Sequence, residues 1–305
     1  MQSTKTSFAK WALVLGIAPA VIFYLFMGIG PSVATFILSF TDISGVKNVP
    51  WHFIGIDNYK EFFFRQSHRD LVQVIGNTIK FCLFVTVVQN AIALPIALSL
   101  NSKFVKGRSF YRAVIFLPVV LGVLVTSLVW MCVLSPLDGP ISKLIGLFGL
   151  TSGFYKDMNV ALWLVIFTQI WMAMGYSMVI NLAGLQEIPT ELYEAGEMDG
   201  TGPWQAFRYI TFPMLWPTIN ANLLLAVIGS LQSFQIILIT TGGNNIPTQT
   251  LAARAMYFAF NIGSTDSTMS MRQGYGATWS MVLFVFVLIA TVIYQRVVNR
   301  KGDEA

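Results

Sequence analysis

Long apolar segments separated by shorter polar ones make up most of this chain of 305 residues. Each apolar segment has about 20 residues or more, the length that an α-helix needs to cross a hydrocarbon core of about 30 Å. The pattern predicts six membrane-spanning helices, at residues 11–40, 71–100, 111–134, 159–184, 218–239 and 274–297. We therefore expect an all-α polytopic membrane protein. No repeat of fixed period and no low-complexity tract divides the sequence, so we expect residues 1–305 to form a single transmembrane domain.

The composition also indicates a membrane protein. Hydrophobic residues make up 55% of the sequence and charged residues only 11%, whereas an ordinary soluble domain has about 25% charged residues. The net charge of +5 comes from short clusters between apolar segments and not from one basic stripe, which argues against a nucleic-acid partner. Cys82 and Cys132 fall inside apolar segments, and His52 and His68 have no second ligand at metal spacing. No disulfide framework and no metal site is expected.

The distribution of Lys and Arg predicts the orientation in the membrane. The first apolar segment is too long for the apolar region of a signal peptide, so we interpret it as a retained span. Basic residues then gather before the first span, between the second and third spans, and after the sixth: Lys5, Lys10, Lys103, Lys106, Arg108, Arg112, Arg296, Arg300 and Lys301. Six spans place these three regions on one side, and the positive-inside rule makes that side cytoplasmic. We expect both termini in the cytoplasm.

The connection between the fourth and fifth spans, residues 186–217, is acidic although it lies on the predicted cytoplasmic side. Its carboxylates, set against the single Arg208, are Glu187, Glu191, Glu194, Glu197 and Asp199. Pro189 and Thr190 precede a helical run at 191–198, which the cluster at 199–202 ends. Pro203 then suits the first position of a second short helix, with Gly202 as its cap.

The first of these two helices has a shape suited to docking. Ala195 and Gly196 leave a small-residue notch beside Tyr193 and the carboxylates, and a short amphipathic helix of this kind can enter a groove on another protein. A solvated connector is the alternative interpretation.

The same segment carries a family resemblance. Residues 193–200, followed by Phe207, Ile210, Pro213 and Pro217, resemble the EAA loop of ATP-binding-cassette (ABC) importer permeases. Gly196 and Thr201 stand where that family usually has Ala. The resemblance implies that the loop is a coupling helix seated in a cleft of an ATP-hydrolysing subunit. It also implies the coupling residues, which are Glu194, Ala195, Gly196, Asp199 and Gly200.

Further landmarks resemble the carbohydrate permeases, in particular the first of two unlike permeases in maltose-type and glycerol-phosphate-type importers. They are Ser39-Phe40-Thr41-Asp42, Gly55 to Tyr59, Asn77-Thr78, Arg112 with Leu117-Pro118, Trp130, and Thr240-Thr241-Gly242-Gly243, where Asn244 replaces the usual Pro. The resemblance implies the type I ABC importer permease fold in a bacterial plasma (inner) membrane. The implied partners are a second, non-identical permease, two ABC ATPase subunits, an extracytoplasmic solute-binding protein and a sugar.

The source of energy follows from motifs that the sequence lacks. No G-x-x-x-x-G-K-[ST] phosphate-binding loop occurs, so ATP and Mg²⁺ are expected in a partner ATPase, with no cofactor and no enzymatic activity in this chain. No Asp or Glu lies in a predicted span, and Lys80 is the one charge close to a core. Proton-coupled carriers usually need carboxylates within the membrane, so a secondary transporter is disfavoured.

A neutral polyol needs hydrogen-bond partners and an apolar or aromatic wall. Gln169, Met172, Ala173 and Tyr176 have the i, i+3, i+4, i+7 spacing that places them on one face of the fourth span. Ser230 and Ser233 share a face of the fifth span, with Asn222 nearer its inner end and Gln232 and Gln235 elsewhere on the helix. By resemblance, the first six positions match sugar contacts of the maltose permease. Hydrogen bonds between neighbouring helices are the alternative interpretation.

The sequence thus predicts the permease subunit of an ATP-driven importer for a sugar or oligosaccharide. The same machinery importing glycerol phosphate or a related phosphorylated solute is the alternative, although the spans offer almost no Lys or Arg to an anion. A stand-alone channel, carrier or membrane enzyme leaves the EAA segment unexplained, and the spans contain no cluster of nucleophilic or acid–base groups.

Overall fold

The computed structural model describes residues 15–65, 67–102, 104–157, 160–242, 245–261 and 271–302, with side chains to residue 297. Within these ranges the secondary structure is helical, apart from one isolated bridge between Thr41 and Phe53. Six helices are long and apolar enough to cross a membrane: Leu15–Leu38, His68–Asn101, Arg108–Val133, Ala161–Gln186, Pro203–Gln232 and Gln273–Val297. The predicted all-α architecture with six spans is confirmed. Lys5, Lys10, Lys103, Gly243 and Asn244, and the side chains of Arg300 and Lys301, lie outside the described parts.

A structured segment at residues 39–65 leads from the first span to the second, and we call it the outer connection after its predicted location. The first span ends in η1 (Leu25–Ile29) and α2 (Gly30–Leu38). The outer connection contains α3 (Asp57–Lys60) and η2 (Glu61–Arg65), and it leads into α4 (His68–Asn101). The third span is α5 (Arg108–Val133). The buried amide of Asn58 donates to the carbonyls of Ser39 and Thr41, and so holds the outer connection against the end of the first span.

The remaining spans alternate with shorter helices. After α5, the short helices α6 (Pro140–Gly146) and η3 (Phe154–Lys156) lead to α7 (Ala161–Gln186). The next helix, α8 (Thr190–Met198), precedes a continuous stretch of α9 (Pro203–Ala206), η4 (Phe207–Thr211) and α10 (Phe212–Gln232). The chain then forms α11 (Gln235–Thr241), η5 (Ile246–Thr248), α12 (Leu251–Phe260) and α13 (Gln273–Gly302).

The fifth span differs from its predicted bounds of 218–239. The helix begins at Pro203 and ends at Gln232, and α11 is a separate helix after Ser233 and Phe234. The second short helix expected from Pro203 is therefore the first turn of this span. Proline suits that position because it has no N–H to lose there. Pro213 and Pro217, expected in the loop, lie in the first turn and in the interior of α10, as membrane helices tolerate.

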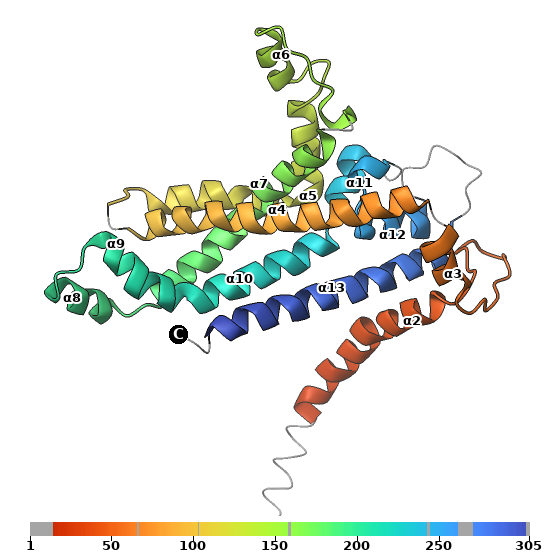
Figure 1. Cartoon of the computed structure of the whole chain (residues 1–305), viewed down its shortest axis with the longest axis horizontal. Coiled ribbons are helices and arrows are strands. Elements are labelled where there is room, and N and C mark those ends of the chain that lie inside the picture. Colours follow the sequence, from red (N-terminus) through yellow and green to blue (C-terminus); the bar gives the residue numbers. More distant parts are fainter. Residues whose placement is uncertain are drawn as a thin grey trace, which may run out of the picture.

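Helices α4, α7 and α10 form the centre of the bundle. An inner core cluster joins them and consists of Ala93, Ala97, Leu100, Met178, Leu182, Leu185, Ile188, Leu215 and Ile219. A second cluster lies nearer the start of α4 and the start of α7, and it includes Phe81, Val165 and Ile236. Figure 1 shows α8 and α9 at one end of the bundle near the end of α13, and α3, α11 and α12 at the other end. The cleft between α4, α7 and α10 and the docking helix α8, both described below, therefore rest on the same packed helices.

Two spans are largely uncovered by the rest of the chain. In the most apolar window of Leu15–Leu38 no residue is buried, and in that of α5 only 17% are. Helix α5 is also interrupted at Gly122, which has φ 73° and ψ 165°, a conformation that favours glycine. A break in a membrane helix is tolerated where protein or a water-filled cavity receives the freed backbone groups. The described part of the chain therefore leaves these two apolar surfaces largely uncovered.

Glycines let α13 approach its neighbours closely. A Cβ at Gly276 would lie 2.6 Å from the backbone nitrogen of Ala259 and 2.7 Å from its Cβ. A Cβ at Gly274 would collide with the carbonyl oxygen of Thr41. Small residues at such contacts allow membrane helices to pack backbone to backbone.

We predict that Gly276→Ala destabilises the protein by about 1–3 kcal/mol, because the new methyl group forces α13 away from α12. Gly76→Ala on α4 is the matched control, since a Cβ there has no atom within 4 Å, and its effect should stay within about 0.5 kcal/mol. Thermal unfolding of the purified complex in detergent measures both. Equal melting temperatures for the two variants would contradict the close packing.

Candidate functional site

Helix α8 has well-defined ends. Pro189 is its N-cap and Glu191 lies in its first turn, where a carboxylate favours the positive end of the helix dipole. At the other end the N–H of Thr201 donates to the carbonyl of Gly196 (3.0 Å), and the N–H of Gly200 donates to that of Glu197 (3.0 Å). These two bonds form a Schellman motif, whose left-handed position is held by Gly200 with φ +76°. Gly200 therefore ends α8.

The predicted coupling residues do not all face the same way. Glu194, Ala195, Asp199 and Gly200 are exposed, whereas Gly196 is buried. A Cβ at Gly196 would lie 2.8 Å from Oγ1 of Thr201 and 3.0 Å from Cδ1 of Ile210. The predicted surface notch of Ala195 and Gly196 is therefore split, because Gly196 allows α8 to pack on its own chain.

The outward side of α8 combines carboxylates with apolar side chains. Glu191, Glu194 and Glu197 are exposed, and Met198 at the end of the helix is 89% exposed. Trp204, which follows on α9, is 70% exposed. We use the name acidic face for the surface formed by Glu191, Glu194, Ala195, Glu197, Met198, Asp199 and Trp204. Sequence patterns did not reveal Met198 or Trp204 as part of it, although a large exposed apolar residue beside charges is typical of a protein contact.

A polar cleft of about 210 Å³ lies between α4, α7 and α10. Four of the six predicted sugar-contact residues line it: Gln169, Ala173, Tyr176 and Ser230. Asn222 also lines the cleft, with Gln89, Ser177, Val85, Leu225, Ala226 and Gly229. None of these residues is charged. Their amides and hydroxyls beside an apolar wall are what an uncharged, hydroxyl-rich ligand requires.

Met172 and Ser233 are not among the residues that line the cleft. Ser233 follows the last residue of α10 and has an extended conformation, so it does not continue the helical face of Ser230 as predicted. Its hydroxyl donates to Oε1 of Gln169 at 3.4 Å. Ser233 thus contacts the cleft through a neighbouring side chain.

A buried hydrogen-bond network forms one side of the cleft. Nε2 of Gln89 donates to Oγ of Ser177 (2.6 Å), and this hydroxyl donates to Oδ1 of Asn222 (3.1 Å). The amide of Asn222 in turn donates to the carbonyl of Ser177 (3.1 Å). The network connects α4, α7 and α10. Gln89 and Ser177 were missed in the sequence because the pattern of one helix does not tell which other helix faces it.

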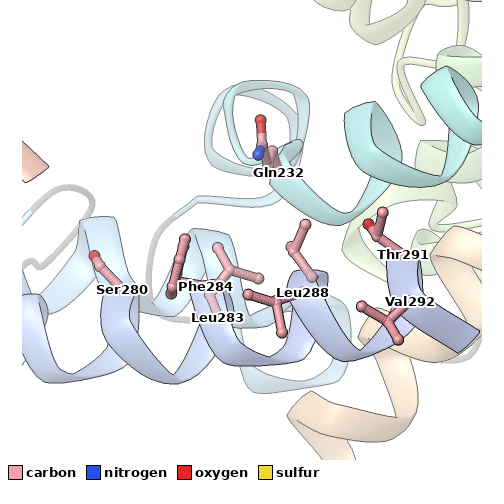
Figure 2. A pocket seen from close by; sticks show the side chains of 8 residues that line it. Gln232, Ser280, Leu283, Phe284, Leu288, Thr291 and Val292 are labelled. Atoms are coloured by element: carbon pink, nitrogen blue, oxygen red, sulfur yellow. The ribbon is translucent and has the colours of Figure 1, made fainter. Parts of the chain in front are cut away.

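A larger groove, of about 520 Å³, has the wrong chemistry for a polyol. It lies between the end of α10 and α13, and its lining is mostly apolar: Leu283, Phe284, Val287, Leu288 and Val292 with Gln232, Ser280 and Thr291. Figure 2 shows Gln232 on α10 across from the apolar side chains of α13. Gln232 lies here and not in the polar cleft. The smaller cleft offers more amide and hydroxyl groups to a polyol than this groove does.

The charged side chains near the core differ from expectation. Lys80 is exposed, whereas Arg254 on α12, outside the predicted spans, is only 8% exposed. Its guanidinium donates to Oε1 of Gln249 (2.7 Å) and lies 4.7 Å from the ring centre of Phe258. Burial lowers the pKa of Arg254. This cation is thus held by α12 and the residues beside it, away from the residues of the polar cleft.

A bidentate ion pair connects the outer connection with the start of α13. Arg272 donates to both carboxylate oxygens of Glu61, at 2.7 and 2.6 Å. The hydrogen bonds from Arg272 to Glu61 raise the pKa of this arginine. The pair fixes η2 against the sixth span.

The described residues contain no group of three or more His, Cys, Asp and Glu that could hold a metal ion. His52 has a structural contact instead, since its backbone N–H donates to Oδ1 of Asp42 at 2.5 Å. This hydrogen bond lowers the pKa of Asp42. It helps to close the turn between the first span and α3.

Comparison with known proteins gives one family. Residues 89–302 match the family described as "Binding-protein-dependent transport system inner membrane component". The chain is similar to the multiple sugar-binding transport system permease protein MsmF of Streptococcus mutans, with 29% identity over 92% of this chain and 91% of that protein. It is also similar to the sn-glycerol-3-phosphate transport system permease protein UgpA of Shigella flexneri, with 28% identity over 99% of each.

The fold is also found in a solved structure. A chain of a bacterial ABC transporter involved in the import of the acidic polysaccharide alginate superposes with a TM-score of 0.81 at 20% identity. The match covers 98% of this chain and 99% of that one. At this level of identity the likeness shows the fold alone.

We predict that Ser177→Ala destabilises the protein by about 1–3 kcal/mol, because Gln89 and Asn222 lose a buried partner. Ser99→Ala is the matched control on α4, where the hydroxyl donates to the carbonyl of Pro95 at an exposed position, and it should change stability by less than about 0.5 kcal/mol. Thermal unfolding of the purified complex compares them. If the Ser177 variant melts like the control, the network does not hold the three helices together.

Proposed function

Because this chain belongs to the family of binding-protein-dependent transport system inner membrane components and is the multi-pass permease of an ABC importer, we propose that it imports a sugar or oligosaccharide. A soluble binding protein delivers the solute from outside, and partner ATPase subunits supply the energy. The observation that carries the proposal is the polar cleft between α4, α7 and α10, whose described lining has amides, hydroxyls and an aromatic ring but no charge.

In this proposal Gln169, Tyr176 and Ser230 supply hydrogen bonds to the hydroxyls of the sugar. The small side chain of Ala173 leaves space between Gln169 and Tyr176 for a sugar ring. Met172 and Ser233 complete the site when the cleft opens, Met172 as an apolar wall and Ser233 through Gln169. Tyr176 is 49% exposed, so it can meet a solute that enters from the partner side of the cleft.

The coupling residues belong to the same proposal. Glu194, Ala195, Asp199 and Gly200 on and beside the acidic face contact a cleft of the ATPase, while Gly196 fixes α8 against its own chain. ATP binding brings the two ATPases together and displaces α8. Because Pro203–Gln232 is one continuous helix that is separated from α8 by only four residues and includes Asn222 and Ser230, a displacement of α8 changes the shape of the cleft. ATP thereby shifts the balance between inward and outward access.

The partners follow from what this chain lacks. A second, non-identical permease covers the first span and α5, whose faces this chain leaves largely exposed. Two ATPase subunits bind ATP and Mg²⁺, since no phosphate-binding loop motif occurs in the sequence. The basic residues around the spans support cytoplasmic N and C termini, and α8 lies at the same end of the bundle as the end of α13 (Figure 1).

Import of glycerol phosphate or a related phosphorylated solute is the second candidate, favoured by the similarity to UgpA. A phosphate requires Arg, Lys or a helix N-terminus directed at it. The described lining of the cleft contains no Lys or Arg. The partner permease must provide the cation in that case.

We predict ATP-dependent uptake of labelled oligosaccharides by vesicles that contain the assembled complex and its loaded binding protein. Glycerol 3-phosphate, added in the same panel, should enter at least about tenfold more slowly, because an uncharged cleft leaves its charge unpaired. Vesicles without ATP are the control. Uptake that persists without ATP would contradict ATP-driven import. Faster uptake of glycerol 3-phosphate than of the oligosaccharides would favour a phosphorylated solute as the substrate.

We predict that Glu194→Lys releases the ATPase while the folded permease stays in the membrane, because it reverses a charge on the acidic face. Glu187→Lys is the matched control, with the same charge change at an exposed position that precedes α8. Co-purification with a tagged ATPase measures retention, and size-exclusion chromatography reports folding. Normal retention and transport by the Glu194 variant would show that α8 is not the coupling element.

A further inference from the structure

Tyr193, like Gly196, lies on the side of α8 that faces away from the acidic face. Its side chain is partly buried and packs against the inner core cluster, which includes Leu185, Ile188 and Leu215. Its hydroxyl lies 3.0 Å from Oγ1 of Thr211. Tyr193 therefore connects α8 with the base of the fifth span through both an apolar and a polar contact.

Thr211 occupies an unusual position in that span. It is the last residue of η4, a π-helical turn inserted between α9 and α10, and is only 6% exposed. Its hydroxyl also lies 3.4 Å from the carbonyl of Ala206, five residues earlier, and either hydroxyl can be the donor in the bond between Tyr193 and Thr211. Insertions of this kind in α-helices frequently occur at functional sites. Here the inserted turn is the place where α8 attaches.

The covalent connection between α8 and the fifth span is short and rich in glycine. Residues 199–202 include Gly200 and Gly202, and the N–H groups of Gly200 and Thr201 belong to the Schellman motif that ends α8. Only these four residues join α8 to the fifth span along the chain. Beside this connection, Gly196 packs on Thr201 and Ile210. Packing at Gly196 keeps α8 from moving closer to the fifth span. A hydrogen bond between the two helices also opposes sliding of one along the other, because it is directional.

We propose that Tyr193 is a positioning residue that fixes α8 to α10 through its hydrogen bond with Thr211, so that movement of α8 reaches the polar cleft instead of bending residues 199–202. This inference rests on the proposed coupling role of α8. The same helix that receives the bond at Thr211 carries Asn222 and Ser230 at the cleft. Tyr193 itself does not touch the solute site.

Tyr193→Phe and Thr211→Val test the link, since each removes one hydroxyl and little volume. In vesicles with the complete complex, both should keep the ATPase bound but lower the ratio of solute imported to ATP hydrolysed by about two- to tenfold. Thr211→Ser keeps the hydroxyl, so its ratio of solute imported to ATP hydrolysed should be that of the wild-type complex. Tyr209→Phe, which removes a hydroxyl from η4 at a side chain that is 70% exposed, is the matched control and should leave the ratio unchanged.

The double variant separates the link from two independent effects. If the hydroxyls act through each other, Tyr193→Phe with Thr211→Val should lower the ratio no more than either change alone. An unchanged ratio in the single variants, additive losses in the double variant, or release of the ATPase by Tyr193→Phe would each overturn the inference. Should Tyr193→Phe fail to assemble, the comparison of Thr211→Val with Thr211→Ser decides in its place.

The outcome for the wild-type complex distinguishes this inference from the proposed function. If wild-type vesicles show no ATP-dependent uptake, the proposed function fails before any variant is compared. If they do, and Glu194→Lys releases the ATPase, an unchanged ratio in Tyr193→Phe rejects the link alone.

Discussion

The structure depends on one constraint, which is that polar groups within a hydrocarbon layer must find their partners inside the protein. Gln89, Ser177 and Asn222 satisfy each other across three helices. This network places α4, α7 and α10 in fixed register, because a slide of any one helix would leave an amide or hydroxyl unpaired at considerable cost. The polar cleft lies beside the network, and the inner core cluster below α8 joins the same three helices. The solute site and the coupling helix thus share one frame.

The six spans could be predicted because length and hydropathy together determine whether a helix can cross a bilayer. The bounds of the fifth span could not. Residues 203–217 contain three prolines and several polar residues, so the sequence predicts only a short helix from Pro203 outside the span, whereas this helix continues through η4 into α10. The helix extends beyond its apolar part because α8 and the inner core cluster pack on its first turns. Hydropathy measures contact with lipid and carries no information on that packing.

Periodicity placed Gln169, Ala173 and Tyr176 on the face of α7 that lines the polar cleft, since i, i+4 and i+7 positions lie together whatever the helix packs against, but it also placed Met172 there, and Met172 does not line the cleft. It failed for Ser233, because the same rule assumes a helix that in fact ends at Gln232. Gly196 is buried because Thr201 and Ile210, later in the chain, pack against α8. Arg254 is buried because of the position of α12 in the bundle. Both are contacts between elements, and a pattern along one element does not contain them.

The uncovered first span has a consequence for how the protein is made. Since the most apolar window of Leu15–Leu38 buries no residue against the described remainder of the chain, this helix leaves most of its apolar surface to lipid or to a neighbouring subunit. It can enter the bilayer as soon as it leaves the ribosome and wait there, because insertion and helix association are separable stages. A helix of this kind can therefore be inserted on its own, before the contacts that assemble the rest of the bundle exist.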